Sequence, residues 1–322
     1  MSEHDRSPFA LDVVIPSWNA RNIIEPCLDA LAAQSRPPAR ILVVDNGSTD
    51  GSAELVAARK GVEVVRLDRN TGFGSAANAG AARCTAPLVC VLNNDAVPDP
   101  DWVAVITDAA AASPADVWAW GSVLLRPDGL IESAGDEYSP AGQAFKRWRE
   151  QTVDVLPAEP YEAFAAPGAA VTVRRSAFAE LGGYAEHFFL YYEDIDLAAR
   201  ARLRGWRALV VPRARIRHQM GASSSSRDVI WFHVARNKPW TALRTRPDAD
   251  VRFALRLVRD EVREAREHDH VRPSVRGSVA ALRGLARAGR ERRAIQATRV
   301  EHEMLTPSLS WPDDWAVHDR GH

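Results

Sequence analysis

The first hundred residues alternate between short apolar runs and segments with helical spacing. The apolar runs are short enough for buried strands, and they are 11–15, 41–45, 62–68 and 88–95. Apolar or small residues recur at helical intervals in the other segments, which are 24–31, 73–83 and 102–112. Strands and helices in this order predict a parallel sheet with helices on both of its faces.

Polar residues follow each of the four predicted strands. They stand at 17–19, 45–46, 68–70 and 93–95. In an open parallel sheet, the carboxyl ends of the strands face the ligand crevice. We therefore expect the chemistry of the protein to lie along this edge of the sheet.

The pattern changes after residue 115. Residues 117–135 read as a hairpin that turns at 127–129, where Pro, Asp and Gly follow one another. Residues 193–204 predict a helix whose acidic first turn suits the positive end of the helix dipole, and 206–212 predict a further strand. From residue 228 the chain is mostly helical and rich in arginine. We divide it into an α/β domain at 8–225 and a helical, arginine-rich extension at 226–322.

Composition narrows the class of protein. A chain of 322 residues with 46% hydrophobic content can bury a large core, and a net charge of −1 argues against a nucleic-acid partner. The three cysteines form no CxxC pair, so we expect buried thiols in a reducing cytosol. Every uninterrupted apolar run is shorter than the roughly 18–20 residues that a helix needs to span a bilayer. We expect a soluble, cytoplasmic protein, at most peripheral at the inner face of a membrane.

Two segments suit the binding of a nucleotide. Asp45, at the end of a strand, can accept hydrogen bonds from a nucleobase imide or a ribose hydroxyl, although Asp-Asn-Gly is also ordinary turn chemistry. The small residues of 70–80 permit close approach of a phosphate to the backbone, or of a helix to the sheet. This segment is not a GxGxxG fingerprint, which argues against a nicotinamide dehydrogenase.

Two further segments carry acidic residues. Asp95 emerges from a buried strand, with Asn93 two residues earlier, and a divalent cation on a diphosphate needs few protein ligands. Glu193, Asp194 and Asp196 crowd three carboxylates into four residues, and their repulsion should raise the pKa of at least one, as a general base requires. For the second group taken alone, an acidic helix start is the favoured explanation.

Taken together and in this order, these segments resemble glycosyltransferase family 2, particularly its bacterial rhamnosyltransferases and galactofuranosyltransferases. The resemblance runs from about residue 10 to 225 and rests on IPSWN, VVDNGSTDGS, NTGFGSAANAG, LNNDA, GGYAEHFFLYYEDIDL and a later His218. It implies the α/β GT-A fold, a Rossmann-like and mostly parallel sheet flanked by helices, followed here by a C-terminal helical extension.

The resemblance also implies roles for single residues. Asp194 matches the family's catalytic base and Glu193 its acidic neighbour. Asp95 and His218 are implied to ligate a divalent cation, Mg²⁺ or Mn²⁺, since Asn93 replaces the first acid of the family's DxD motif. The implied nucleotide-binding residues are Pro16, Asn19, Asp45, Asn70, Gly72, Asn78 and Asn94. The implied sugar or acceptor pocket consists of Pro167, Gly168, Ala169 and Trp18.

The implied reaction is metal-assisted transfer of a sugar, with inversion, from a nucleoside-diphosphate sugar to an acceptor hydroxyl. A dTDP- or UDP-linked donor is favoured, and the acceptor is a glycan, a lipid-linked saccharide or a small molecule. Two alternatives stay open: a non-catalytic nucleotide- or carbohydrate-binding module, and a sugar-1-phosphate nucleotidyltransferase. Nucleotidyltransferases usually carry a Gly-rich loop with Arg or Lys after the first strand, and this chain has IPSWNARN there instead. The C-terminal helices could pack on the domain, form a homodimer or touch anionic lipid.

Overall fold

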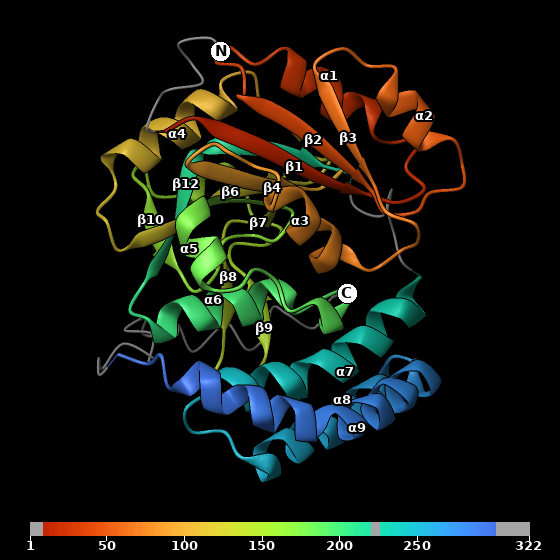
Figure 1. Cartoon of the computed structure of the whole chain (residues 1–322). Helices are drawn as coiled ribbons and strands as arrows, with labels where there is room; N and C mark the ends of the chain where they lie inside the picture. The colour runs from red at the N-terminus through yellow and green to blue at the C-terminus, as the bar shows by residue number, and fades with distance from the viewer. Residues whose placement is uncertain (1–8, 220–225, 301–322) are drawn as a thin grey trace.

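The computed structural model describes residues 9–219 and 226–300 (Figure 1). The strands of its main sheet are β1 (Leu11–Ser17), β2 (Arg40–Asp45), β3 (Val62–Arg66), β4 (Leu88–Leu92), β5 (Ala96–Pro98), β6 (Val117–Leu125), β7 (Ile131–Ser133), β10 (Tyr161–Ala163), β11 (Ala170–Arg174) and β12 (Arg207–His218). A separate pair is formed by β8 (Asp136–Tyr138) and β9 (Ala144–Lys146). The α-helices are α1 (Glu25–Ala32), α2 (Ser52–Ala57), α3 (Phe73–Ala81), α4 (Trp102–Ala112), α5 (Arg175–Glu180), α6 (Glu193–Leu203), α7 (Arg227–Thr245), α8 (Val251–Glu267) and α9 (Val271–Gln296).

The main sheet is mostly parallel, as the sequence predicts. Its order is β3-β2-β1-β4-β11-β6-β12-β10, with β7 added to β6 and β5 to β12. Strands β3, β2, β1 and β4 pair in parallel, and so do β6 and β12, whereas β11 and β10 are antiparallel to their neighbours. The carboxyl ends of β1, β2, β3 and β4 therefore meet at one edge, where the polar residues were expected.

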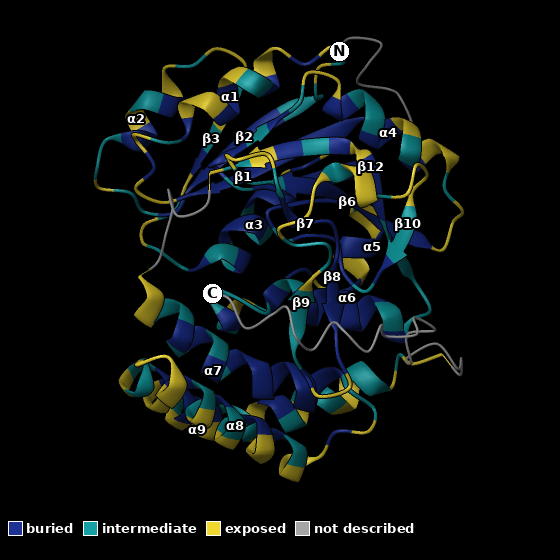
Figure 2. Ribbon diagram, turned by 180° about the vertical axis from the view of Figure 1, so that it is seen from behind, coloured by how far each residue is buried: buried dark blue, intermediate teal, exposed yellow. Residues whose placement is uncertain are grey.

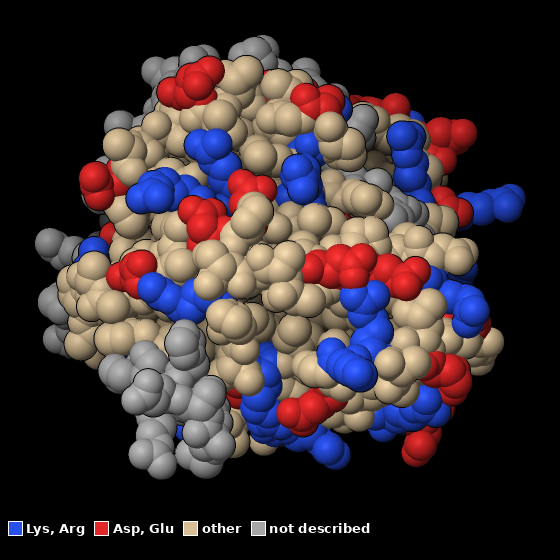
Figure 3. Space-filling view, turned by 90° about the horizontal axis from the view of Figure 1, so that it is seen from above, with Lys and Arg blue, Asp and Glu red and all other residues tan. Residues whose placement is uncertain are grey.

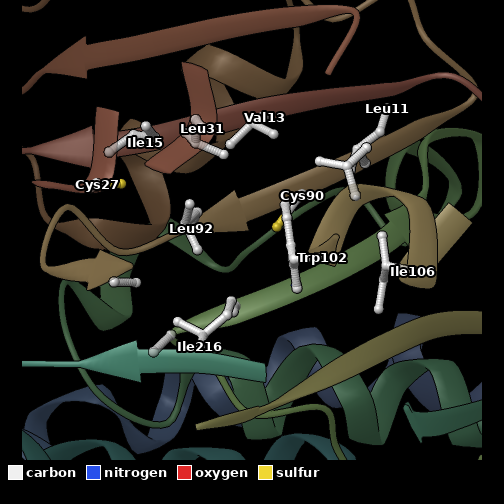
Figure 4. Close-up of a cluster of buried hydrophobic side chains, with 14 of the residues drawn as sticks. Leu11, Val13, Ile15, Cys27, Leu31, Cys90, Leu92, Trp102, Ile106 and Ile216 are labelled. Carbon is white, nitrogen blue, oxygen red and sulfur yellow. The ribbon is translucent and has the colours of Figure 1, made fainter. Parts of the chain in front are cut away.

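Hydrophobic cores lie on both faces of this sheet. Along β1, Leu11, Val13 and Ile15 pack on one side with α1 and α4, as Figure 4 shows, whereas Val14 packs on the other with α3, α5 and α6. This alternation is the two-residue period of a strand buried on both faces. All three cysteines are buried and free, which confirms the expectation that they form no disulfide.

Two strands are longer than their sequence patterns predict. Pro16 lies inside β1 rather than ending it, because β4 pairs with β1 only as far as Val14 and a missing N–H is tolerated beyond that point. Strand β12 runs on past the predicted end at residue 212 as far as His218. A register shift between Val211 and Arg215 lets its second half pair with the end of β6 and with β5.

The helices α7, α8 and α9 form a layer beneath α6 in Figure 1. Buried ion pairs connect the helices of this layer with one another and connect the layer with α6 of the α/β part. The ammonium group of Lys238 on α7 pairs with Glu261 of α8 at 2.5 Å, and Arg244 of α7 lies 3.3 Å from Asp196 of α6. No helix among residues 9–219 and 226–300 is long and apolar enough to cross a membrane.

Candidate active site

The loops that follow β1 and β2 are tied to each other by hydrogen bonds. Asn19 donates its backbone N–H to Ser48 Oγ at 2.9 Å, and its side-chain oxygen accepts from the Thr49 N–H at 2.9 Å. Asp45 is buried at the end of β2 and accepts from the Ser48 N–H at 3.1 Å. Asn19 and Asp45, both predicted nucleotide contacts, thus lie against the same loop, next to the buried Pro16.

Asn46 joins these loops to the one after β3, a role that the sequence did not reveal. Its side-chain nitrogen donates to Asn70 Oδ1 at 3.1 Å and to the Gly72 carbonyl at 3.2 Å, and its oxygen accepts from the Thr71 N–H at 2.9 Å. Gly72 has a φ of 91°, and a Cβ there would meet the backbone oxygen of Phe189 at 2.5 Å. The only signal for Asn46 was its place after Asp45, which reads as ordinary turn chemistry.

The glycine-rich segment shows close packing, one of the two uses that its sequence allowed, and approach of a phosphate stays a prediction. Gly72 belongs to the loop, whereas Gly80 is a packing residue, because a Cβ on it would overlap the side chain of Val14 in β1. Asn78 is held at both ends of its amide by the backbone of Tyr184, each hydrogen bond being 2.9 Å long. The amide thereby fixes α3 to the segment before α6, and a nucleotide contact from Asn78 stays a prediction.

The structure brings the two predicted cation ligands together. His218 Nε2 lies 3.1 Å from Asp95 Oδ1 and 3.3 Å from the side-chain nitrogen of Asn93. His218 Nδ1 is 2.6 Å from a carboxylate oxygen of Glu132, whose other oxygen accepts from Lys146 at 2.6 Å. Glu132 and Lys146 were missed, because an alternating hairpin strand makes a lone glutamate look solvent-exposed although it is buried.

The hydrogen bonds around His218 and Glu132 shift the pKa values of both residues. Burial alone would lower the pKa of His218, but its hydrogen bonds to Asp95 and Glu132 raise it to about 9. Burial would likewise raise the pKa of Glu132, but the hydrogen bond from His218 and the charge of Lys146 lower it to about 2. Without a metal, the raised pKa favours a protonated imidazole between the two carboxylates, and a cation at this place would have to displace the proton on Nε2.

This pair of side chains fits a divalent cation. Among the described residues, no three His, Cys, Asp or Glu side chains are grouped so that they could hold a metal ion. The donor set is limited to Asp95 and His218, and a cation bound to a diphosphate takes its other ligands from phosphate and water. Glu132, on the far nitrogen of His218, stands where a carboxylate orients a metal-binding imidazole. Asn94, beside this pair, is buried.

The predicted base lies at the first turn of α6, against a second predicted segment. Asp194 Oδ1 accepts from the Ile195 N–H at 2.7 Å. Its other oxygen faces Gly168, where a Cβ would overlap it. Burial raises the pKa of the Asp194 carboxyl. The glycine at 168 therefore leaves room for the carboxylate itself, in addition to any sugar that approaches.

The other two carboxylates of this turn have different surroundings. Glu193 is buried, and burial followed by the charge of Asp194 raises its pKa to about 8. Repulsion between the carboxylates thus contributes, as the sequence predicts, but burial is the larger cause. Asp196 is fully buried and pairs with Arg200 at 2.8 Å and with Arg244 at 3.3 Å, so it holds helices together.

The segment 167–169 connects the base to the cation pair. The Asn93 N–H donates to the Ala169 carbonyl at 2.9 Å, while Gly168 contacts Asp194. Asp136 lies near the base and near the pair of Glu132 and Lys146 beside His218, since burial and the charge of Asp194 raise its pKa to about 7 while Lys146 opposes the rise. The predicted pocket segment, base and cation ligands are therefore contiguous. Trp18, predicted for the same pocket, is 51% exposed at the end of β1.

A strained turn precedes the base, and α7 holds it. Phe189, Tyr191 and Tyr192 all have φ between 65° and 68°, a conformation that non-glycine residues rarely adopt. The side-chain nitrogen of Asn237 lies 3.0, 2.8 and 2.7 Å from the carbonyl oxygens of Phe188, Leu190 and Tyr191. Sequence reasoning missed Asn237, because it lies in a segment that reads as an appended helix.

We expect Asn237→Ala to loosen this turn. The substitution removes the shared donor from three carbonyls and should lower the free energy of unfolding by about 1–3 kcal/mol. Hydrogen exchange, followed by mass spectrometry, should accelerate in the amides of 188–195. Gln296→Ala is the matched control, since Gln296 also donates to a carbonyl of α7 but far from the turn. Unchanged exchange at 188–195 in Asn237→Ala would show that the turn holds itself.

Comparison with known proteins identifies the family. The model of "Glycosyl transferase family 2" matches residues 12–182. An N-acetylglucosaminyl-diphospho-decaprenol L-rhamnosyltransferase of Mycobacterium tuberculosis is 28% identical over 296 residues, which cover 83% of this chain and 95% of that protein. The O-antigen chain rhamnosyltransferase RfbN of Salmonella typhimurium is 25% identical over 214 residues, 65% of this chain and 66% of that protein.

A solved structure supports the fold. The mannosyltransferase PcManGT from Pyrobaculum calidifontis, in complex with GDP-Man and Mn²⁺, superposes with a TM-score of 0.53 at 18% identity, over 89% of this chain and 84% of that one. The predicted GT-A architecture is thereby confirmed. The chain belongs to glycosyltransferase family 2 and is a glycosyltransferase, a membership first indicated by the order of its strand-end motifs.

Proposed function

We propose that the protein transfers a sugar from a nucleoside-diphosphate sugar to an acceptor hydroxyl, with inversion and with Asp194 as general base. One arrangement carries the proposal. The carboxylate of Asp194 contacts Gly168, and the neighbouring Ala169 is hydrogen-bonded to Asn93, beside the pair Asp95 and His218. A base and a site for a diphosphate's counter-ion thus lie on two sides of one short segment of small residues.

Asp194 is positioned to accept a proton. The Ile195 N–H fixes one carboxylate oxygen, which leaves the other on the side of Gly168. The acceptor oxygen would bond to the anomeric carbon while its proton passes to Asp194 and the bond from that carbon to the diphosphate breaks. A single displacement inverts the configuration at this carbon. A raised pKa strengthens Asp194 as a base, and burial with the charge of Asp194 raises the pKa of the adjacent Glu193 to about 8, which favours an uncharged Glu193 beside the base.

The residues near Asp95 would serve the leaving group. A divalent cation, when bound, neutralises charge on the departing nucleoside diphosphate. Asp95 and His218 Nε2 would hold the cation, with His218 oriented by Glu132. On the opposite side of β1, Asp45, Asn19 and the loops tied by Asn46 would receive the nucleoside. Asn70, Gly72 and Asn94 remain proposed contacts of the same nucleotide.

The relatives suggest the sugar and the acceptor. Both curated relatives are named as rhamnosyltransferases, and the first is named for an N-acetylglucosaminyl-diphospho-decaprenol acceptor. We therefore favour an L-rhamnosyl donor, dTDP- or UDP-linked, and a saccharide on a polyprenyl diphosphate, in polysaccharide biosynthesis. Family membership argues against the nucleotidyltransferase alternative and the non-catalytic module. The domain limits at 8–225 and 226–322 remain part of the proposal, as does a cytoplasmic location.

Asp194→Asn tests the base. The amide cannot accept the proton, so kcat should fall by about 10²–10⁴-fold, the usual contribution of a general base. Binding of the nucleoside diphosphate, measured by calorimetry, should stay within about twofold because nucleotide contacts are untouched. Asp116→Asn, which alters an exposed carboxylate paired with Arg207, is the control and should keep full activity. Full transfer by the Asp194 variant would remove this residue from the role.

Gly168→Ala tests the contact between the pocket segment and the base. The added methyl group overlaps Asp194 Oδ2, so it should displace the carboxylate and reduce kcat by roughly a hundredfold, as misplacement of a catalytic group does. The folded state should persist in thermal unfolding. Gly289→Ala in α9 is the matched control, because a Cβ there meets nothing within 4 Å. Equal activity of both variants would disprove the contact's importance.

Removal of metal tests the cation site. Transfer should stop in EDTA and return with Mg²⁺ or Mn²⁺. In thermal-shift measurements, a nucleoside diphosphate should stabilise the wild type more with the cation than without it, because a cation held by Asp95 would add to the affinity for the diphosphate. Asp95→Ala should abolish this metal-dependent increment and keep the metal-independent part. Activity that persists undiminished in EDTA would show that the cation has no role.

A further inference from the structure

The outer side of α8 and α9 exposes an unusual share of the protein's large apolar side chains. Eight large hydrophobic residues are exposed in the described part of the chain, and five of them lie on these two helices. They are Val251 and Leu255 on α8 and Val275, Val279 and Leu282 on α9, each 40–52% exposed. Figure 2 shows exposed residues along α8 and α9 on the side turned away from α7. The apolar side chains are therefore concentrated on one surface.

These residues form two stripes that run side by side. On α8, Val251 and Leu255 are continued at helical spacing by the half-buried Val258 and Val262. On α9, the stripe of residues 275, 279 and 282 continues to Ala286. Val251 and Ala286 line the same pocket, which places the start of the α8 stripe beside the end of the α9 stripe. The two antiparallel helices thus present one apolar strip.

Arginines border this strip. Helix α8 carries five exposed arginines and α9 carries six, eleven in all, whereas Glu267 is the only exposed acidic residue on these two helices and Asp260, Glu264 and Glu291 are half-buried. With 3.6 residues per turn, the arginines of each helix lie next to its apolar stripe, on the side farther from α7. We call the combined surface of exposed apolar residues and arginines on α8 and α9 the basic face.

The opposite end of the molecule has a different charge pattern. In Figure 3, Lys and Arg are interspersed with Asp and Glu on the face seen from above. Around α1, α2, β3 and α4, ion pairs couple the two signs, among them Arg40 with Glu63 and Arg66 with Glu54. On α8 and α9, Arg259 pairs with Asp260 and Arg287 with Glu291, but most of the exposed arginines have no such ion pair among the described residues. The basic face thus differs from that end in its excess of positive charge and in its apolar strip.

We propose that the basic face docks on an anionic lipid surface. Apolar side chains beside a row of arginines suit the lipid interface, where the former enter the acyl boundary and the guanidinium groups contact the phosphates of the headgroups. Long arginine side chains reach these phosphates while the helix axis lies parallel to the membrane. The contact would hold the enzyme at a membrane, where a lipid-linked acceptor resides, but it does not depend on Asp194 or on the identity of the donor.

The arginines and the apolar strip of the basic face favour a lipid surface over a second copy of the chain or a nucleic acid. A second copy docked symmetrically would bring the eleven exposed arginines of one basic face against the eleven of the other, and like charges in an interface repel. A nucleic acid would neutralise the arginines but would leave Leu255 and Leu282 in water. An anionic membrane satisfies both the charge and the apolar strip.

Vesicle sedimentation with the full chain tests the proposal. The protein should sediment with vesicles of phosphatidylcholine and phosphatidylglycerol, and not with phosphatidylcholine alone, and added salt should weaken the binding. Arg256→Glu with Arg283→Glu should reduce binding by at least about tenfold. Leu255→Gln with Leu282→Gln should do so too, without a change of charge. The control is Arg59→Glu with Arg66→Glu, which changes the net charge equally on the opposite face and should bind like the wild type.

Two further measurements separate the outcomes. Thermal unfolding and transfer to a soluble acceptor should be unchanged in all variants, so that lost lipid binding is not lost folding or lost catalysis. Equal sedimentation with both kinds of vesicle, or full binding by the basic-face variants, would overturn the proposal. It would also fail if the wild type formed dimers in solution that the same variants dissolved, or bound RNA more tightly than the anionic vesicles, since either result assigns the face to another partner.

Discussion

The site depends on the hydrogen bonds between Asn237 and the turn that precedes α6. Three non-glycine residues of that turn, Phe189, Tyr191 and Tyr192, have a left-handed backbone, which is unfavourable and has to be stabilised by the surroundings. One buried amide from α7 lies within hydrogen-bond distance of three carbonyls there. The same turn accepts a hydrogen bond from Phe73 N–H at 2.7 Å, beside the loop proposed to bind nucleotide. The C-terminal helices thereby help to place groups at both ends of the site.

Charge in the site is balanced in two different ways. Around His218, opposite charges alternate, with Asp95 and Glu132 on either side of the imidazole and Lys146 beyond. Around Asp194, no cation among residues 9–219 and 226–300 pairs with the neighbouring Glu193, and burial raises the pKa of Glu193 instead. The first arrangement suits the binding of a cation and the second suits the acceptance of a proton. The different surroundings of His218 and Asp194 therefore support the two proposed roles, cation binding at the first and proton acceptance at the second.

The sequence predicted the fold and much of the candidate site through local patterns. Short apolar runs that end in polar residues specified the parallel strands β1 to β4 and the edge where they meet, because strand burial and strand ends leave a signal within a few residues. The acidic turn at Asp194 and the strand end at Asp95 were found in this way. The predicted ends of four strands were wrong: β3 and β4 stop at Arg66 and Leu92, before the polar residues that the prediction included, and β1 and β12 run on because pairing partners far along the chain decide where they stop.

Contacts between distant segments were beyond the reach of the sequence. Asn46, Glu132 and Asn237 each act on a segment at least twenty residues away, and each has an ordinary local explanation as a turn, an exposed strand residue or a helix surface residue. The sequence by itself determined which residues are buried in strands and helices and which polar groups end those strands, because these depend on local periodicity. Only the tertiary structure decided that Gly168 abuts Asp194, that Glu132 orients His218 and that α7 holds the turn before the base, because packing alone brings those side chains together.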